Sequence, residues 1–427
     1  MAAAVAQGSV APNWSTLVSE SRLWQRLMAV AEIGGFTDAD GNHGVNRPCL
    51  TPLDREARRK LIGWAGAMGA SVSVDPAGNL FLRLEGEDPS LPPVLTGSHM
   101  DSQPAGGRFD GIYGVLAGLE AIEAVAAAGI RPKRAIEVVA WTNEEGGRFA
   151  PGCTGSMSFS GFKPIEAFDD ILDRDGIRYA DALAEQLAAE ADLPRRPLGF
   201  RPHAYLEAHI EQGPRLEAEG REIGVVTGIQ GSRWLTVTVE GRTDHAGTTP
   251  LALRRDAVQD MLRAIAALNT LMRDPADVLR FTVGSIRVAP GTSNTVASRA
   301  EFTIDFRHPD PAVLAARGDA IAGVVQAAMT ACTVSVHERF HAAPVQFGRA
   351  VPDAVEAAAA ALGLSALRMP SGAFHDAQFL APLCPTGMVF IPCRRGVSHH
   401  PAEYAEPSAC ANGARVLAQA LVALAQA

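Results

Sequence analysis

The sequence lacks several features that would identify a class of protein at once. Its 427 residues contain no uncharged apolar run approaching about 18 residues, so we expect no membrane-spanning helix. The N-terminus, MAAAVAQGSVAPNW, has neither a basic segment nor a sustained apolar segment, and we expect a frayed tail there rather than a signal peptide. Basic residues do not outnumber acidic ones, and the net charge of -9 argues against a nucleic-acid partner.

The six cysteines also lack a pattern, because no two have the CxxC spacing of a zinc or redox motif. We interpret them as buried or inert thiols in a reducing compartment. A hydrophobic content of 47% and a charged content of 20% are typical of a soluble globular protein, and we expect a cytoplasmic enzyme with no membrane partner. The chain is too long for one ordinary core, so two domains are expected.

The first part of the chain has an α/β pattern. Residues 92–98 read as a short buried strand, a long apolar helix opens after Asp110, and residues 134–142 read as the next strand. Strand, helix and strand in this order indicate a βαβ unit in a mixed, mostly parallel sheet. Ligands bind outside the carboxyl ends of such strands, and His99 and Glu144 both follow strand ends.

The pattern changes near residue 224. Strands over 234–242, 281–288, 300–308 and 332–340 and helices near 252–273 and 310–330 give the order βαββαβ, which is ferredoxin-like. An α/β pattern resumes after residue 340, with a helix near 352–363, a strand over 387–392 and a helix from about 407. The sequence therefore predicts a discontinuous catalytic domain, 1–223 and 341–427, interrupted by an inserted α+β domain, 224–340.

Residue types that bind zinc in hydrolytic enzymes occur in unusual local settings. The candidates for a two-metal site are His99, Asp110, Glu145, His209 and one of the adjacent pair His399 and His400. Asp110 follows a Gly-Gly turn and opens a helix, where the chain can approach closely, so we expect it to bridge two metals. His99 and His209 would complete one site, and Glu145 and the C-terminal histidine the other.

Two further carboxylates have predicted roles beside the metals. Asp101 follows His99 by two residues, and we expect it to accept the second imidazole N–H and orient the ring. Glu144 is not needed as a ligand, so it is the candidate general base that takes a proton from water and returns it to the leaving nitrogen. Alone, the NEE run would be a solvated turn, but its combination with HMD and FDG favours a site.

These motifs together resemble one family. HMDS…GGRFDG, NEEGGRF, HIEQGP and SHxPxE resemble the dinuclear-zinc amidohydrolases of the M20 peptidase-like group, which have a zinc-aminopeptidase-like catalytic domain. Within this group they are similar to the branch of N-carbamoyl-L-amino-acid hydrolase, β-ureidopropionase and allantoate amidohydrolase. The resemblance runs from residue 44 to the C-terminus. In its pattern, His399 is the ligand and His400 occupies the variable position of SHxPxE.

The resemblance implies roles for other residues. The inserted domain would be a lid that also forms a homodimer. Gln212 would contact the substrate, and Asn294 and Arg307 would bind its carboxylate, for which a planar guanidinium is suited. His245 would act across the dimer and stabilise the oxyanion. The alternative for Arg307 is a surface ion pair, and for His245 a histidine that stabilises a turn.

The expected activity is metal-dependent hydrolysis of the carbamoyl (ureido) C–N bond of an N-carbamoyl-L-amino acid or a related ureido acid. The expected cofactors are two divalent ions, with zinc first and manganese, cobalt or nickel as alternatives. The rival activities are an M20 aminoacylase or dipeptidase and an allantoate amidohydrolase. A non-catalytic protein on a decayed enzyme fold is a further alternative. The presence of Glu144 and of all five candidate metal ligands argues against it. Phe374 stands where the family pattern often has glycine, which leaves the pocket shape and the ureido substrate open.

Overall fold

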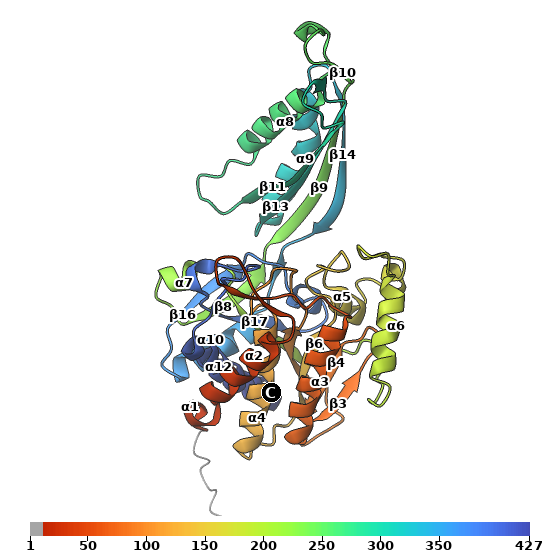
Figure 1. Ribbon diagram of the computed structural model, residues 1–427. Helices are drawn as coiled ribbons and strands as arrows, with labels where there is room; N and C mark the ends of the chain where they lie inside the picture. The colour runs from red at the N-terminus through yellow and green to blue at the C-terminus, as the bar shows by residue number, and fades with distance from the viewer. Residues whose placement is uncertain (1–11) are drawn as a thin grey trace, which may run out of the picture. The chain divides into compact units, whose positions relative to one another are not determined.

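The computed structural model describes residues 12–427 and divides into two compact units. The first contains the described residues up to Thr227 together with Phe347–Ala427, and the second is Gly228–Gln346. Figure 1 shows both. The predicted boundaries, after residues 223 and 340, lie a few residues too early. The reason is that β8 (Ile223–Ile229) pairs with β17 (Thr386–Ile391), so this segment continues the sheet of the first unit.

The sheet of the first unit is mixed. Its strand order is β15-β8-β17-β7-β5-β6-β4-β3, with β16 paired to β8. The other strands are β3 (Ser71–Val74), β4 (Leu80–Leu84), β5 (Val94–His99), β6 (Ile136–Trp141), β7 (Ala204–Ile210), β15 (Val345–Gln346) and β16 (Ala366–Ser371). The pairs β17–β7, β7–β5 and β5–β6 are parallel, whereas β15–β8, β8–β17, β6–β4 and β4–β3 are antiparallel. The expectation of a mostly parallel sheet is corrected here, because short connections such as that between β3 and β4 allow only antiparallel pairing.

Helices cover both faces of this sheet. One layer is made by α1 (Trp14–Leu17), α2 (Glu20–Ala31), α3 (Pro52–Ala67), α4 (Ile112–Ala127), α10 (Ala350–Ala361) and α12 (Pro407–Gln426). Leu82 and Val138 belong to the core under this layer. Phe81 and Trp141, at alternate strand positions, instead contact Phe159 of α5 (Thr154–Ser160), which marks the opposite face. On that side also lie α6 (Tyr179–Ala189) and α11 (Ala377–Leu380).

Two findings at the chain ends qualify the expectations from sequence. The tail expected over 1–14 falls mostly outside the described residues, but Trp14 begins α1 and is buried. Within the described chain, α12 alone has the length and apolar composition to cross a membrane. It lies in the core of the first unit, where Leu417 and Leu421 pack, and this accounts for its apolar composition.

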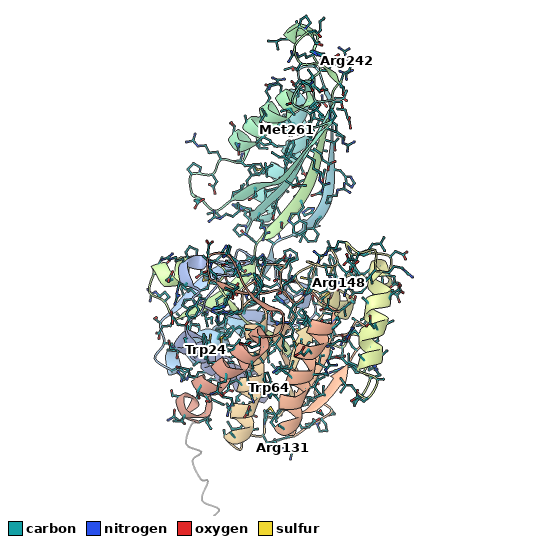
Figure 2. The ribbon with its side chains drawn as sticks, viewed as in Figure 1. Trp24, Trp64, Arg131, Arg148, Arg242 and Met261 are labelled. Carbon is teal, nitrogen blue, oxygen red and sulfur yellow. The ribbon has the colours of Figure 1, made fainter. Side chains whose placement is uncertain are left out.

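The second unit is a four-stranded antiparallel sheet with helices on one face. Its strands are β9 (Gly231–Glu240), β11 (Arg280–Ala289), β13 (Arg299–His308) and β14 (Thr333–Ala342), in the order β11-β13-β9-β14. The helices are α8 (Ala257–Leu271) and α9 (Pro311–Ala327), so the chain follows the order βαββαβ. Met261 of α8, labelled in Figure 2, is buried in the core with Phe302 and Ile304 of β13.

Short elements complete both units. In the first they are β1 (Gly35–Thr37), β2 (His43–Val45), η1 (Ile165–Phe168), α7 (Arg215–Ala218) and η3 (Arg394–Gly396). In the second they are β10 (Asp244–His245), η2 (Leu251–Leu253) and β12 (Thr295–Val296). β10 and β12 form a two-stranded ribbon.

The close approach of α4 to the sheet generates a prediction. A Cβ atom added at Gly114 would lie 2.2 Å from the carbonyl oxygen of Ala208 in β7 and 2.8 Å from Cβ of Ser98 in β5. Gly114→Ala should therefore lower the free energy of unfolding by about 1–3 kcal/mol through overpacking. Gly63→Ala, inside α3 with no atom within 4 Å, is the matched control. It should raise stability by up to about 1 kcal/mol through helix propensity. Chemical denaturation of both variants checks this, and equal effects would contradict it.

Candidate active site

The five candidate metal ligands all lie near the carboxyl ends of the parallel strands. His99 is the last residue of β5, and Glu145 follows β6. His209 is the penultimate residue of β7, and His399 lies in the loop after β17. Because β17, β7, β5 and β6 are neighbours in the sheet, their ends bring together residues that are far apart in the sequence.

The ligand atoms form two groups that share Asp110. Within each group, His99-Asp110-His209 and Asp110-Glu145-His399, the atoms lie within 4.8 Å of one another. Asp110 Oδ1 is 3.1 Å from Nε2 of His209 and 3.8 Å from Nε2 of His99. Its other oxygen, Oδ2, is 3.1 Å from Nε2 of His399. The two oxygens of one carboxylate thus face two different sets of donors, as a bridging ligand requires.

These separations fit divalent metal ions. Ligands at zinc bond lengths of about 2.0–2.1 Å in a tetrahedral site lie roughly 3.3–3.4 Å apart. The distances of 3.1–3.8 Å between Asp110 and the three histidines, and of 3.5 Å between His399 and Glu145, bracket this value. Imidazole nitrogen and carboxylate oxygen are the donors that hydrolytic zinc sites use. The residues present therefore form a candidate metal centre.

The pKa shifts of the buried carboxylates also favour a metal centre. Burial raises the pKa of Glu144 well above its usual range, and burial together with Asp110 raises the pKa of Glu145 to about 8. Burial also acts to raise the pKa of Asp110. His209 and His399 outweigh this effect, and the pKa of Asp110 lies well below its usual range. Several buried carboxylates thus stand close together, and bound cations would relieve their repulsion.

The two buried histidines are oriented by the backbone. His99 Nδ1 donates to the carbonyl oxygen of Asp101 at 2.9 Å, and His209 Nδ1 donates to the carbonyl oxygen of Ile210 at 2.9 Å. Both rings therefore turn Nε2 toward Asp110, which fixes the tautomer that a ligand needs. The predicted role of the Asp101 carboxylate is corrected here, because it lies 3.7 Å from His99 Nδ1 and accepts the backbone N–H groups of Glu144 and Glu145 instead.

Three residues that hold the ligands were not predicted to do so. Glu403 is buried and accepts the backbone N–H groups of Phe109 and Asp110 at 2.9 and 3.0 Å. Ser398 donates to Glu403 at 2.8 Å and to Asp110 at 3.2 Å. Gln103 donates to Glu145 Oε2 at 2.7 Å. Ser398 and Glu403 were visible as part of SHxPxE, but nothing in that motif indicates that Glu403 contacts a loop far away in the chain.

Two other residues lie beside the centre. Gln212, the predicted substrate contact, donates to Asp110 Oδ2 at 2.9 Å and to Ser398 at 3.2 Å. His400 accepts the backbone N–H of Ala402 at 3.0 Å, so His399 and not His400 faces Asp110.

The remaining predicted residues belong to the second unit. His245 Nδ1 accepts the backbone N–H groups of Gly247 and Thr248, as in a turn-stabilising histidine. The backbone carbonyl oxygen of Asn294 accepts the N–H of Ala246. The ribbon of β10 and β12 thus brings His245 and Asn294 together. Arg307 lies in β13 and forms an ion pair with Asp305 at 2.8 Å.

Comparison with known proteins identifies the family. Residues 95–423 match peptidase family M20/M25/M40. The chain belongs to this family. It is 39% identical over 421 residues to an N-carbamoyl-L-amino-acid amidohydrolase of Rhizobium meliloti, a match that covers 97% of this chain and 99% of that protein. It is 35% identical to the allantoate amidohydrolase of Escherichia coli (strain K12), over 91% of this chain and 94% of that one.

A solved structure supports the fold. The amidase of the hydantoinase/carbamoylase family from Burkholderia multivorans is 43% identical and superposes with a TM-score of 0.85. The match covers 96% of this chain and 98% of that chain.

The contacts of Glu403 generate a prediction for this M20 centre. Glu403→Ala leaves two buried N–H groups without their acceptor, so the free energy of unfolding should fall by about 1–3 kcal/mol. Because Asp110 loses its anchor, the metal-free protein should also bind zinc more weakly, as measured by competition with a chromophoric chelator. Glu406→Ala is the control, since Glu406 is exposed and pairs with Arg394 at the surface. Zinc affinity equal to wild type in Glu403→Ala would contradict the anchoring role.

Proposed function

We propose that the chain is a metal-dependent amidohydrolase that cleaves the carbamoyl C–N bond of N-carbamoyl-L-amino acids and releases the amino acid, carbon dioxide and ammonia. The observation that carries the proposal is the pair of donor groups sharing Asp110, with Glu144 beside them but in neither. The near-full-length similarity to an N-carbamoyl-L-amino-acid amidohydrolase supports this substrate class. The buried free thiols of all six cysteines support a reducing, cytoplasmic setting.

The proposed cofactors are two divalent ions, with zinc first. One would be held by His99, Asp110 and His209, and the other by Asp110, Glu145 and His399. When bound, such ions polarise a carbonyl oxygen and lower the pKa of water. Manganese, cobalt and nickel stay alternatives, because sites made of imidazole and carboxylate discriminate weakly between these metals.

Glu144 is the proposed general base. Its Oε2 lies 3.4 Å from Nε2 of His99, and Oε1 accepts a hydrogen bond from the thiol of Cys153 at 3.5 Å. Asp101 holds the backbone of the turn in place. From this position Glu144 takes a proton from the attacking water and delivers it to the amino nitrogen as the C–N bond breaks. The carbamic acid that leaves decomposes to carbon dioxide and ammonia.

The second unit is proposed to act as a lid and a dimerisation domain. Arg307 and Asn294 would bind the substrate carboxylate, and Gln212 of the first unit would contact the substrate. His245 would reach the site of the partner in a homodimer and stabilise the oxyanion. Its Nδ1 already accepts two backbone N–H groups, so a neutral ring carries its proton on Nε2, the donor that this role needs.

Allantoate is the second candidate substrate, which the similarity to the allantoate amidohydrolase of Escherichia coli favours. An aminoacylase or dipeptidase is the third possibility, because the family that matches is described as a peptidase family, M20/M25/M40. All three reactions would use the same donor set. An aminoacylase differs from the carbamoyl hydrolase in the acyl group that water attacks, and an allantoate amidohydrolase differs in the group that is expelled.

A substrate panel tests the reaction class. Metal-loaded protein should release ammonia from N-carbamoyl-L-amino acids, and a chelator should abolish the release. N-carbamoyl-β-alanine and allantoate test the neighbouring activities, and N-acetyl amino acids serve as the control. Cleavage of the N-acetyl compounds with no ammonia from any ureido compound would overturn the proposal in favour of an aminoacylase.

The adjacent glutamates should respond differently to the same change. Glu144→Gln should lower kcat by about 10²–10⁴ through loss of general-base catalysis, while the metal content measured by mass spectrometry stays at the wild-type value. Glu145→Gln should lower the metal content, because it removes a charged ligand. Loss of metal in Glu144→Gln would contradict its role as a base that is not a ligand. Wild-type metal content in Glu145→Gln would contradict its role as a ligand.

A further inference from the structure

Cys153 brings a thiol to the carboxylate of Glu144. It directly precedes α5 and is 1% exposed, and its Sγ donates to Oε1 of Glu144 at 3.5 Å. Burial and, next, the charge of Glu144 raise the pKa of this thiol well above its usual range, so the sulfur keeps the proton that it donates. Among the residues that the structure describes, the one hydrogen bond to this carboxylate comes from Cys153.

The backbone of Glu144 is already held on both sides of the residue. Its N–H donates to Asp101 at 3.2 Å, and its carbonyl oxygen accepts the N–H of Cys153 at 3.0 Å. The freedom that remains is that of the side chain, and a glutamate has several staggered rotamers. A donor on Oε1 restricts them and leaves Oε2, 3.4 Å from Nε2 of His99, on the side of the candidate metal ligands.

The thiol is presented from a backbone conformation that suits glycine better. Cys153 has a φ of +57° and a ψ of +26°, in the left-handed region, where a side chain carries a steric cost. A non-glycine residue held in this region is typical of functional sites. Here the conformation directs Sγ at Glu144, whereas the sequence indicated only buried or inert thiols.

We propose that Cys153 is a positioning residue for Glu144 and holds Oε1 so that Oε2 faces the attacking water. In the proton transfer, the O–H bond of water breaks and Oε2 takes the proton, while the thiol keeps its own proton throughout. A misplaced base slows this step without weakening substrate binding, so the contribution of Cys153 falls on kcat and not on KM. The inference rests on the proposed function, in which Glu144 is the general base.

Cys410 provides a matched control. It is also 1% exposed and lies in α12, within the core of the first unit. Tyr113 donates to its backbone carbonyl oxygen, a contact that substitution of the side chain retains. No catalytic or binding role is assigned to Cys410. Replacing it therefore removes one buried thiol from the same unit without changing the surroundings of Glu144.

The experiment compares alanine and serine at both positions in the metal-loaded full-length enzyme, on a compound of the substrate panel that the wild type hydrolyses. Cys153→Ala should lower kcat about tenfold, the scale of one hydrogen bond to a charged group, and leave KM within about twofold. Cys153→Ser keeps an O–H donor on a side chain scarcely larger than that of alanine, so it should recover most of the loss. Both Cys410 variants should keep the wild-type kcat, and the metal content should be alike in all four.

Combination with Glu144→Gln isolates the coupling. If Cys153 acts through Glu144, Cys153→Ala should lower kcat no further in the Glu144→Gln background. Multiplying losses would overturn the positioning role, as would wild-type kcat in Cys153→Ala or equal losses in Cys153→Ala and Cys153→Ser. A wild-type enzyme inactive on every compound of the panel would instead refute the proposed function, and this inference with it.

Discussion

One carboxylate, that of Asp110, sets the geometry on which the centre depends. Its two oxygens face histidines that come from three different strand ends, so the parallel order of those strands decides whether the groups meet. The chain must also turn immediately after it. Gly111 has a φ of +66°, and a Cβ atom there would lie 2.2 Å from the ring of His99. The Asp-Gly step at the start of α4 is therefore a steric requirement of the site.

In the second unit, Arg307 and His245 both have internal partners, which are compatible with the roles proposed for them. Arg307 has its ion pair with Asp305, and His245 accepts two backbone N–H groups, which are the structural alternatives for both residues. In each case the partner fixes one side of a polar group and thereby the direction of the other. Such contacts preorganise a donor before any substrate arrives.

Much of the fold was predictable because periodicity marks half-buried elements. The alternation in β9 and β13 and the apolar run of α4 located these elements to within a few residues. β7, which positions His209, was not predicted, although β6 and β17 are just as buried and were. Glu207 and His209 interrupt its apolar run, whereas β6 and β17 keep runs such as VVAW and MVFI. Local spacing found Asp101 but not the atom it uses, since its carbonyl and its carboxylate are equally near His99 in the sequence. Glu403 was not assigned its role because a hydrogen bond to Asp110, so distant in the chain, has no local pattern.

The place at which the second unit enters and leaves has an evolutionary consequence. Ile229 at the end of β8 and Val345 at the start of β15 are partners in an antiparallel ladder. In terms of the first sheet, residues 230–344, which make up nearly all of the second unit, therefore occupy the position of a hairpin loop. A duplication, replacement or loss of this unit in a single genetic event would leave the register of every other strand intact. A change of length at this point alters the loop of a hairpin, while the strand ends that bring the candidate ligands together keep their neighbours in the sheet.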